Sequence, residues 1–152
     1  MLESLLLTVA LAIPNDSSDR EWSLNRPSRG THARVIQEAA EVPKSIRPWA
    51  ECVVRRESGG TLDRIQSGVG ARNPNSSASG KFQFLDNSWR RGLSFMVRDR
   101  LVEFGMPKRE ANKVRKYLGS MPIYKWHGYY QTVGFVEVVS RGGKFHWNGP
   151  GC

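Results

Sequence analysis

Apolar residues recur at helical spacing in several parts of the chain, and the clearest case lies at residues 48–58. On a helix, four apolar side chains of this stretch would share one face: Trp49, Ala50, Val53 and Val54. Pro48 suits the first turn of a helix, where a missing N–H group has no partner to lose. Gly59 and Gly60 then allow the left-handed backbone that ends a helix. The pattern predicts a helix over residues 48–58.

The chain predicts four more helices and one turn-rich insert. The expected helices cover residues 32–41, residues 86–105 with Asp86, Asn87 or Ser88 as the cap, residues 108–118, and a last stretch from Pro122 or Tyr124 to about Arg141. Residues 61–84 are rich in Gly, Ser, Asn and Pro, which predicts turns and a small hairpin. We therefore expect an α+β fold, mainly α, with a small turn-rich or β insert.

The length of 152 residues suits one folded domain. We assign that domain to residues 43–152, and residues 1–42 to an N-terminal apolar segment followed by a polar linker. Residues 5–12 are apolar and end in Ala-Leu-Ala, like the core of a secretory signal peptide, but Glu3 precedes them and no Lys or Arg does. A short helix that packs on the domain is the alternative. The segment is too short to span a bilayer, so no stable membrane insertion is expected.

Charge narrows the choice of partners. The formal net charge is +9 and the pI is about 10.1, so the surface attracts polyanions. Basic residues of the expected helices alternate with acidic ones, as on an ordinary solvated face, so nucleic acid is not the expected partner. The three histidines and two cysteines lack metal-ligand spacing, and no phosphate-binding glycine loop occurs. Neither a metal nor another cofactor is expected.

Cys52 and Cys152 are the two cysteines of the chain, and Cys152 is its last residue. Their placement predicts a disulfide that fastens the last residues to the helix at residues 48–58, with two free thiols as the alternative. A disulfide would indicate an oxidising compartment, and hence export or action outside the cell.

Glu57 is the candidate for acid–base chemistry. At 100° per residue it falls near the middle of the apolar arc of its helix, in the last turn before Gly59. Desolvation and the negative end of the helix dipole both favour a protonated carboxyl there, which is what a general acid needs. The alternative is that Glu57 turns to solvent or pairs with an arginine.

Three blocks of sequence then follow one another in a fixed order. They are Glu-Ser-Gly-Gly at residues 57–60, Gly-Lys-Phe-Gln-Phe at residues 80–84 and Asn-Ser-Trp at residues 87–89. This order resembles the transglycosylase-like and resuscitation-promoting-factor-like domains of the lysozyme superfamily. The C-terminal cluster of aromatic, Gly, Pro and Cys residues is similar too, and in such domains its cysteine is bonded to one near the catalytic helix. The resemblance runs from about residue 48 to the C-terminus.

The resemblance implies a lysozyme-like domain and a role for particular residues. Glu57 matches the catalytic glutamate of the family, and Gln83 matches the glutamine that lines its sugar-binding cleft. Three aromatic residues match positions that shape that cleft or the core beneath it: Phe82, Phe84 and Trp89. Four others near the chain end are candidates for stacking on sugars, with a place in the core as the alternative: Trp126, Tyr129, Tyr130 and Trp147. Residues 92–130 are longer and more basic than in compact relatives, which leaves cleft depth and substrate length open.

The implied activity is cleavage of peptidoglycan glycan strands by a lytic transglycosylase or a muramidase. Hydrolysis ordinarily uses a second carboxylate, and the nearest ones in sequence, Asp63 and Asp86, lie in no recognisable partner motif. We favour a route with one carboxyl, in which Glu57 protonates the leaving oxygen and then deprotonates the 6-hydroxyl of the sugar to close an anhydro ring. Substrate-assisted hydrolysis stays open. A non-catalytic wall-binding or phage virion module is the alternative function.

Peptidoglycan strands are therefore the expected partner. The expected location is extracellular, at the cell wall, or on a phage virion. We expect a monomer unless the protein is part of a virion. Anionic wall polymers explain the positive charge at least as well as nucleic acid does.

Overall fold

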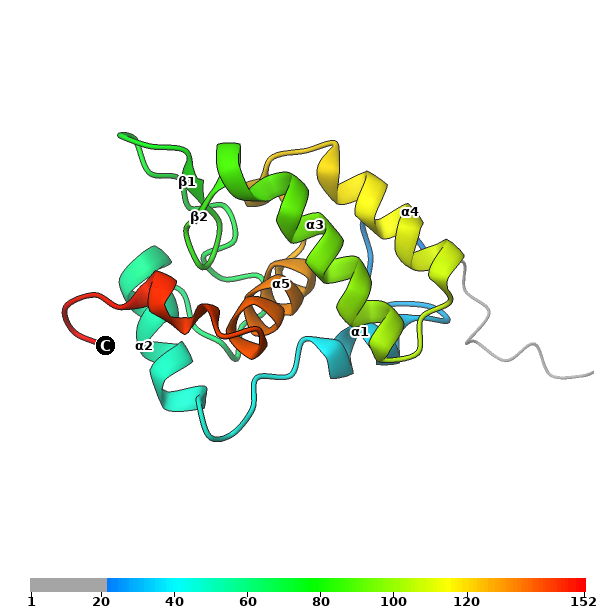
Figure 1. The fold of residues 1–152 in the computed structure, drawn as a ribbon, viewed down its shortest axis with the longest axis horizontal. Coiled ribbons are helices and arrows are strands. Elements are labelled where there is room, and N and C mark those ends of the chain that lie inside the picture. Colours follow the sequence, from blue (N-terminus) through cyan, green and yellow to red (C-terminus); the bar gives the residue numbers. More distant parts are fainter. Residues whose placement is uncertain (1–21) are drawn as a thin grey trace, which may run out of the picture.

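Helix α5 (Gly128–Ser140) lies at the centre of the computed structural model, which describes residues 22–152 (Figure 1). All its side chains at residues 130–138 are buried. The helix is apolar on nearly every side, and such a helix needs cover all round. It begins later than the sequence predicted, because Ile123–Lys125 form a separate short 3₁₀ helix, η2.

The start of α5 is fixed by a close approach of the loop that follows the second helix. A Cβ atom on Gly128 would lie 1.8 Å from the carbonyl oxygen of Ile65, so only glycine fits there. The amide of Gly128 donates to Gln66 Oε1 at 2.6 Å. His127 caps the helix, since its Nδ1 accepts a hydrogen bond from the amide of Tyr129 at 3.2 Å. This loop therefore rests on the first turn of α5.

Helices α3 (Asp86–Glu103) and α4 (Lys108–Gly119) confirm two predicted helices, and α3 packs on both α4 and α5 (Figure 1). The predicted cap of α3 is wrong. Leu85 is the N-cap residue and no side chain caps the helix. The Asp86 carboxylate instead accepts from the guanidinium of Arg90 and from the amide of Ile123, the latter at 2.7 Å. Asp86 thus ties the start of α3 to η2.

Helix α2 (Arg47–Ser58) confirms the helix predicted first, and Gly59 ends it in the left-handed conformation with φ of 71°. The C-terminal segment, which includes the 3₁₀ helix η3 (Gly143–Trp147), runs beside α2 (Figure 1). A disulfide joins Cys52 of α2 to Cys152, as predicted. The bond fastens the last residues of the chain to α2.

The turn-rich insert contains one small antiparallel hairpin. Strand β1 (Ala78–Ser79) pairs with β2 (Phe84–Leu85), with Ala78 opposite Leu85. The insert lies between α2 and α3 in the sequence. The fold class is therefore α+β, mainly α, with one disulfide, as predicted from the sequence.

The folded unit begins before the boundary predicted at residue 43. Helix α1 (Ala33–Ala39), which the sequence predicted, buries Ile36 and Ala39 in the same core as α3 and α5. Further upstream, the hydroxyl of Tyr130 donates to the carbonyl oxygen of Leu24 at 2.9 Å. Residues 22–42 therefore belong to the domain, because they cover apolar surface that would otherwise face water. The apolar segment at residues 5–12 lies outside the described residues.

Within residues 22–152, no helix has both the length and the apolar content needed to cross a membrane.

Candidate active site

Glu57 lies in the last turn of α2, and its side chain is 25% exposed. Three residues of the predicted apolar arc are buried beneath it: Ala50, Val53 and Val54. The carboxyl group is therefore partly buried and still reachable from solvent. Only one of its oxygens is occupied within the described part of the chain, because Oε1 accepts hydrogen bonds whereas Oε2 accepts none. Oε2 is therefore the carboxyl oxygen that is left open to contact a bound molecule.

Arg56 provides the hydrogen bonds to Oε1. Its Nε lies 2.9 Å and its Nη2 lies 2.6 Å from Glu57 Oε1, so the alternative pairing with an arginine is present. The same Nη2 donates to the carbonyl oxygen of Trp147 at 2.9 Å. A Cβ atom on Gly149 would lie 2.9 Å from Arg56 Nη1, so glycine allows the tail to pass close to the guanidinium. Arg56 thus bridges the candidate acid and the C-terminal segment.

A small hollow of about 90 Å³ gathers four of the residues predicted to bind substrate. Its lining consists of Gln83, Phe84, Leu85, Trp89, His146 and Trp147. These residues come from the β2 turn, the start of α3 and η3, so the fold brings together positions that are far apart in the sequence. The link to Glu57 runs through Trp147, whose carbonyl oxygen Arg56 contacts.

Gln83 takes a strained position in the turn between the two strands. Its φ is 54°, a left-handed value that a side chain makes unfavourable. The side-chain Nε2 donates to the carbonyl oxygens of Gly80 at 2.9 Å and Ala71 at 3.3 Å. These bonds fix the direction of the amide. Its oxygen accepts no hydrogen bond from residues 22–152, which leaves it available to a sugar hydroxyl.

Aromatic rings form most of the hollow. The ring centroids of Phe84 and Trp147 are 5.4 Å apart, and those of Trp89 and His146 are 4.8 Å apart, both in edge-to-face geometry. The indole N–H of Trp147 donates to the carbonyl oxygen of Phe82 at 2.9 Å, which holds the ring in place. Phe84 and Trp147 are only 4% and 5% exposed, so the half-buried Trp89 is the ring of this set that can offer an apolar face to a bound molecule.

Three of the aromatic residues considered for substrate binding lie in the core instead. Phe82 is fully buried and stacks on Phe135 with ring centroids 4.1 Å apart. Tyr130 is also fully buried, and burial raises the pKa of its hydroxyl well above the usual value. Trp126 is buried in the same way, with its indole N–H bonded to the carbonyl of Leu118 at 3.0 Å. None of these three rings can stack on a sugar in this structure.

Neither candidate for a second catalytic carboxylate lines the hollow. Asp63 is exposed and pairs with Arg47 at 3.3 Å. Both oxygens of Asp86 are engaged by Arg90 and by the amide of Ile123. Glu57 does not line the hollow either, and its carboxyl is joined to the C-terminal segment only through Arg56, which also binds the carbonyl oxygen of Trp147.

The sequence missed two residues of this region, Arg56 and His146. The sequence left a pairing of Glu57 with an arginine as an alternative but did not point to Arg56, because residues i and i+1 of a helix point about 100° apart. His146 directly precedes the predicted Trp147, and that adjacency is the one available signal for it. Among residues 22–152, no cluster of His, Cys, Asp and Glu could hold a metal ion.

Comparison of the chain with protein-family models, with curated proteins and with solved structures finds no match.

Proposed function

We propose that this protein cleaves the glycan strands of peptidoglycan, with Glu57 as its catalytic acid. The observation that carries the proposal is the contact chain from Glu57 through Arg56 to Trp147. Trp147 lines one hollow with Gln83, Phe84 and Trp89, three residues that belong to the sequence motifs. The hollow offers aromatic side chains and one oriented amide, which suit a sugar, and a partly buried carboxyl is joined to it through Arg56.

The reaction needs one carboxyl group that acts twice. Glu57 Oε2 gives its proton to the oxygen of the scissile glycosidic bond, and the bond to the anomeric carbon breaks. The resulting carboxylate then takes the proton of the 6-hydroxyl on the same sugar, whose oxygen bonds to the anomeric carbon. The products are an anhydro sugar at one end and a free hydroxyl at the other, and no water is consumed. Substrate-assisted hydrolysis is the variant in which water attacks instead.

Arg56 positions the acid in this proposal. It binds Oε1 and leaves Oε2 open, so the carboxyl presents one defined oxygen to the substrate. Gln83 would receive a sugar hydroxyl, and Trp89 would contact a sugar face, while the 5% exposed Trp147 would support the hollow from the core. The disulfide supports a location outside the cell, at the wall or on a phage virion, because such bonds persist in oxidising surroundings.

The size of the hollow favours a second candidate function. At about 90 Å³ it is smaller than an ordinary ligand pocket, for which about 300 Å³ is a lower bound. A module that binds the wall without cleaving it would need no larger site. The second candidate is therefore a non-catalytic wall-binding or virion module with the same fold.

One experiment separates the two functions. Purified peptidoglycan is incubated with the protein and with Glu57→Gln, and the soluble products are analysed by mass spectrometry. We expect anhydro-ended fragments from the native protein and a loss of at least about 10²-fold in rate with Glu57→Gln, since the amide keeps the shape but cannot deliver a proton. Glu103→Gln, at the exposed end of α3, is the matched control and should cleave normally. Binding without products from the native protein would favour the non-catalytic module.

A further inference from the structure

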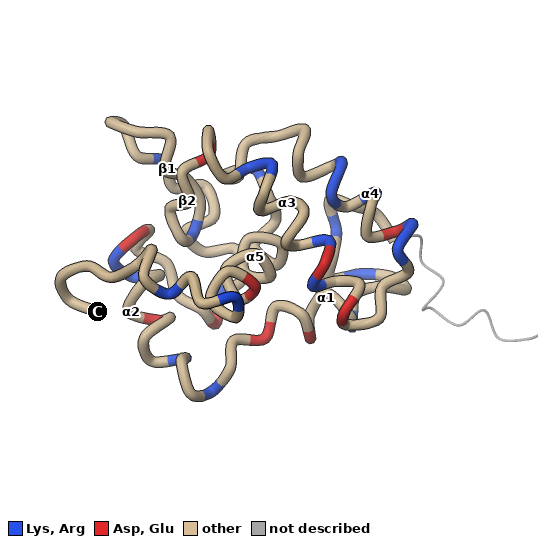
Figure 2. Tube along the Cα trace, in the orientation of Figure 1, with Lys and Arg blue, Asp and Glu red and all other residues tan. Residues whose placement is uncertain are grey.

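Two polar hollows lie along the start of α3, apart from the lining of the candidate active site. The larger, of about 610 Å³, lies between α3 and α4, and the smaller, of about 310 Å³, lies between the hairpin and η2. Both are lined by Asp86 and Arg90, so they meet at these residues and form one extended groove. We call it the α3 groove. Figure 2 shows Lys and Arg positions at the start of α3 and along α4.

The α3 groove is strongly cationic. Its lining holds five basic residues: Arg72, Arg90, Arg91, Arg115 and Lys116. Asp86 is the one acidic residue in the lining, and both its oxygens are already bonded, one to Arg90 and one to the amide of Ile123. The negative charge of Asp86 is therefore offset by these protein partners, and the electrostatic potential in the groove favours a bound anion.

Several donors in the groove have no partner in the described part of the chain. Arg115 Nε and Ser79 Oγ are buried atoms without a hydrogen bond, and Ser79 is only 4% exposed. Arg91 and Lys116 form no ion pair within residues 22–152. Buried donors without partners are costly, and a bound acceptor would remove that cost.

We propose that the α3 groove binds a phosphodiester polymer of alternating polyol and phosphate units. Phosphate oxygens match the guanidinium and ammonium groups of Arg91, Arg115 and Lys116. Polyol hydroxyls match the hydroxyl of Ser79, which has no hydrogen-bond partner among residues 22–152. An extended groove that joins two hollows suits a linear chain with repeated charges better than a single small anion.

The lining argues against single-stranded nucleic acid, which is bound by aromatic rings on which bases stack. Tyr124 is the one aromatic residue in the lining of the two hollows, and the guanidinium of Arg72 lies 4.6 Å from the centre of its ring. One face of that ring is thus covered. The groove offers charge and hydroxyl partners without a stacking platform.

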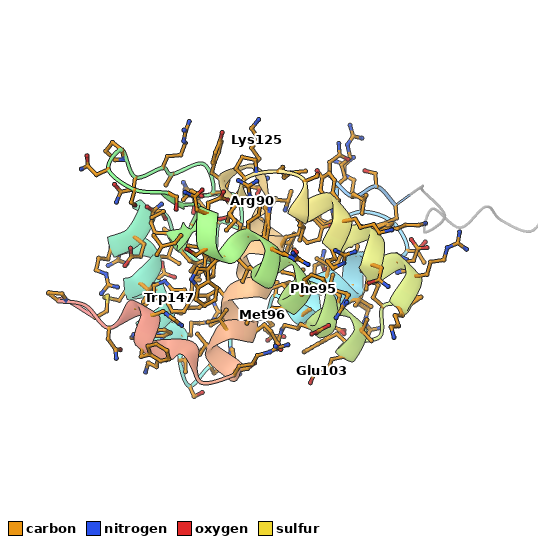
Figure 3. All side chains as sticks on the ribbon, turned by 45° about the horizontal axis from the view of Figure 1, so that its top comes forward. Arg90, Phe95, Met96, Glu103, Lys125 and Trp147 are labelled. Atoms are coloured by element: carbon orange, nitrogen blue, oxygen red, sulfur yellow. A yellow bond between two sulfur atoms is a disulfide. The ribbon has the colours of Figure 1, made fainter. Side chains whose placement is uncertain are left out.

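The groove is placed to act together with the candidate active site. Trp89 lines the aromatic hollow and its neighbour Arg90 lines the α3 groove, so the two sites use different faces of the first turns of α3. Figure 3 shows Arg90 and Trp147 on opposite sides of this part of the helix. The choice of a wall polymer rests on the proposed function, whereas the anion site itself does not. Binding of the polymer would hold the protein on the wall while a glycan strand occupies the other face.

The test measures binding of fluorescently labelled poly(glycerol phosphate) to the full chain by anisotropy at several salt concentrations. The double variant Arg115→Gln/Lys116→Gln should weaken binding by on the order of tenfold and reduce the slope of log K against log salt by about 1 to 2, because two phosphate contacts are lost. The double variant Lys108→Gln/Arg109→Gln removes the same charges from the other end of α4 and should bind as the native protein does. Arg91→Gln, an exposed change, repeats the test where the first variant folds poorly.

An equal loss in both double variants would overturn the site, since it would mean that only overall charge matters. Tighter binding of single-stranded oligothymidylate with the same number of phosphates would overturn the choice of polymer in favour of nucleic acid. The readout involves no peptidoglycan, so it is independent of cleavage. A protein that cleaves peptidoglycan but does not bind the polymer would refute this inference alone, and the reverse result would refute the proposed function alone.

Discussion

Arg56 and Glu57 are neighbours in α2 whose side chains bend toward each other, with Arg56 Nη2 2.6 Å from Glu57 Oε1. The guanidinium also binds the carbonyl oxygen of Trp147 at 2.9 Å, so one side chain holds both the candidate acid and the tail. Both partners are about one quarter exposed, which leaves the pair at the edge of the protein rather than inside it. The position of the candidate acid therefore depends on the C-terminal segment.

Arg56→Ala should lower kcat by more than it changes KM. The variant keeps every side chain that lines the hollow but leaves the Glu57 carboxyl without its two hydrogen bonds, and loss of orientation acts on the chemical step. We expect kcat for peptidoglycan cleavage to fall by on the order of tenfold or more. Steady-state kinetics with soluble glycan fragments measures both constants.

Arg55→Ala is the control for this variant, because Arg55 is exposed and neither of the bonds to Glu57 or Trp147 involves it. Arg56→Lys should restore part of kcat, since an ammonium can still reach one acceptor but cannot serve as a planar fork. A parallel fall in activity for Arg55→Ala and Arg56→Ala would contradict the positioning role.

Sequence patterns were sufficient for the helices and for the disulfide. Gly59 ended α2 where the pattern placed the break, with a positive φ that glycine adopts at no steric cost. The same reasoning failed for the start of α5. There the limit is set by Ile65, whose carbonyl occupies the space of a side chain at Gly128. The start of α5 is thus set by a contact with a loop distant in the sequence, and the pattern of apolar and polar residues around Gly128 does not predict such a contact.

The candidate site was predictable only in part. Helical spacing placed Glu57 near the apolar face, and the motifs named Gln83, which lines the hollow. The sequence does not separate aromatic residues of the core from those near the hollow: Tyr130 is fully buried, whereas Trp147 is 5% exposed and lines the hollow. The hydrogen bond from Arg56 to Trp147 joins residues that are 91 positions apart in the sequence, and it depends on how the tail folds back.

Loss of the disulfide should destabilise the protein and lower its activity. The bond closes a loop with a sequence separation of 100 residues, and in terms of unfolded-chain entropy such a loop contributes about 4 to 5 kcal/mol. We expect a lower melting temperature for the double variant Cys52→Ser/Cys152→Ser, measured by calorimetry. The activity of this variant should also be lower at temperatures at which it is still folded, because the tail positions Arg56.

A reducing agent supplies the control for the disulfide. It should lower the melting temperature of the native protein and leave that of the double serine variant unchanged. An unchanged melting temperature of the native protein on complete reduction would show that the bond has no structural role.

Trp89→Leu should weaken binding of the glycan with a smaller effect on kcat. Leucine keeps apolar contact with Phe84, whose ring centroid is 5.7 Å from that of Trp89, but it removes the flat face for a sugar. We expect KM to rise by about two- to twelvefold, the range that about 0.5 to 1.5 kcal/mol of aromatic contact gives. Phe145→Leu is the control, since Phe145 is 63% exposed and does not line the hollow. An unchanged KM in Trp89→Leu would remove this ring from the binding site.

Lys81 should make the unfolding free energy depend on pH. Its side chain is fully buried, and Nζ donates to the carbonyl oxygens of Arg64 at 2.8 Å and Ile65 at 3.4 Å. Burial lowers the pKa of this lysine to about 8, while Glu51 and Asp63 oppose the change. The amine thus holds the loop after α2 against the hairpin at the cost of a desolvated charge.

The sign of the effect follows from the two states. Between pH 8 and the ordinary lysine pKa of 10.5, the unfolded chain keeps a proton that the folded protein has released. Raising the pH across this window therefore favours folding, and the stability that Lys81 contributes is lowest below pH 8. Urea titrations at several pH values should show the unfolding free energy of the native protein rising relative to that of Lys81→Met. Lys125→Met, a change at an exposed lysine, should leave the pH dependence as in the native protein. Parallel curves for the native protein and Lys81→Met from pH 7 to 10.5 would mean that the buried amine is not desolvated as the structure indicates.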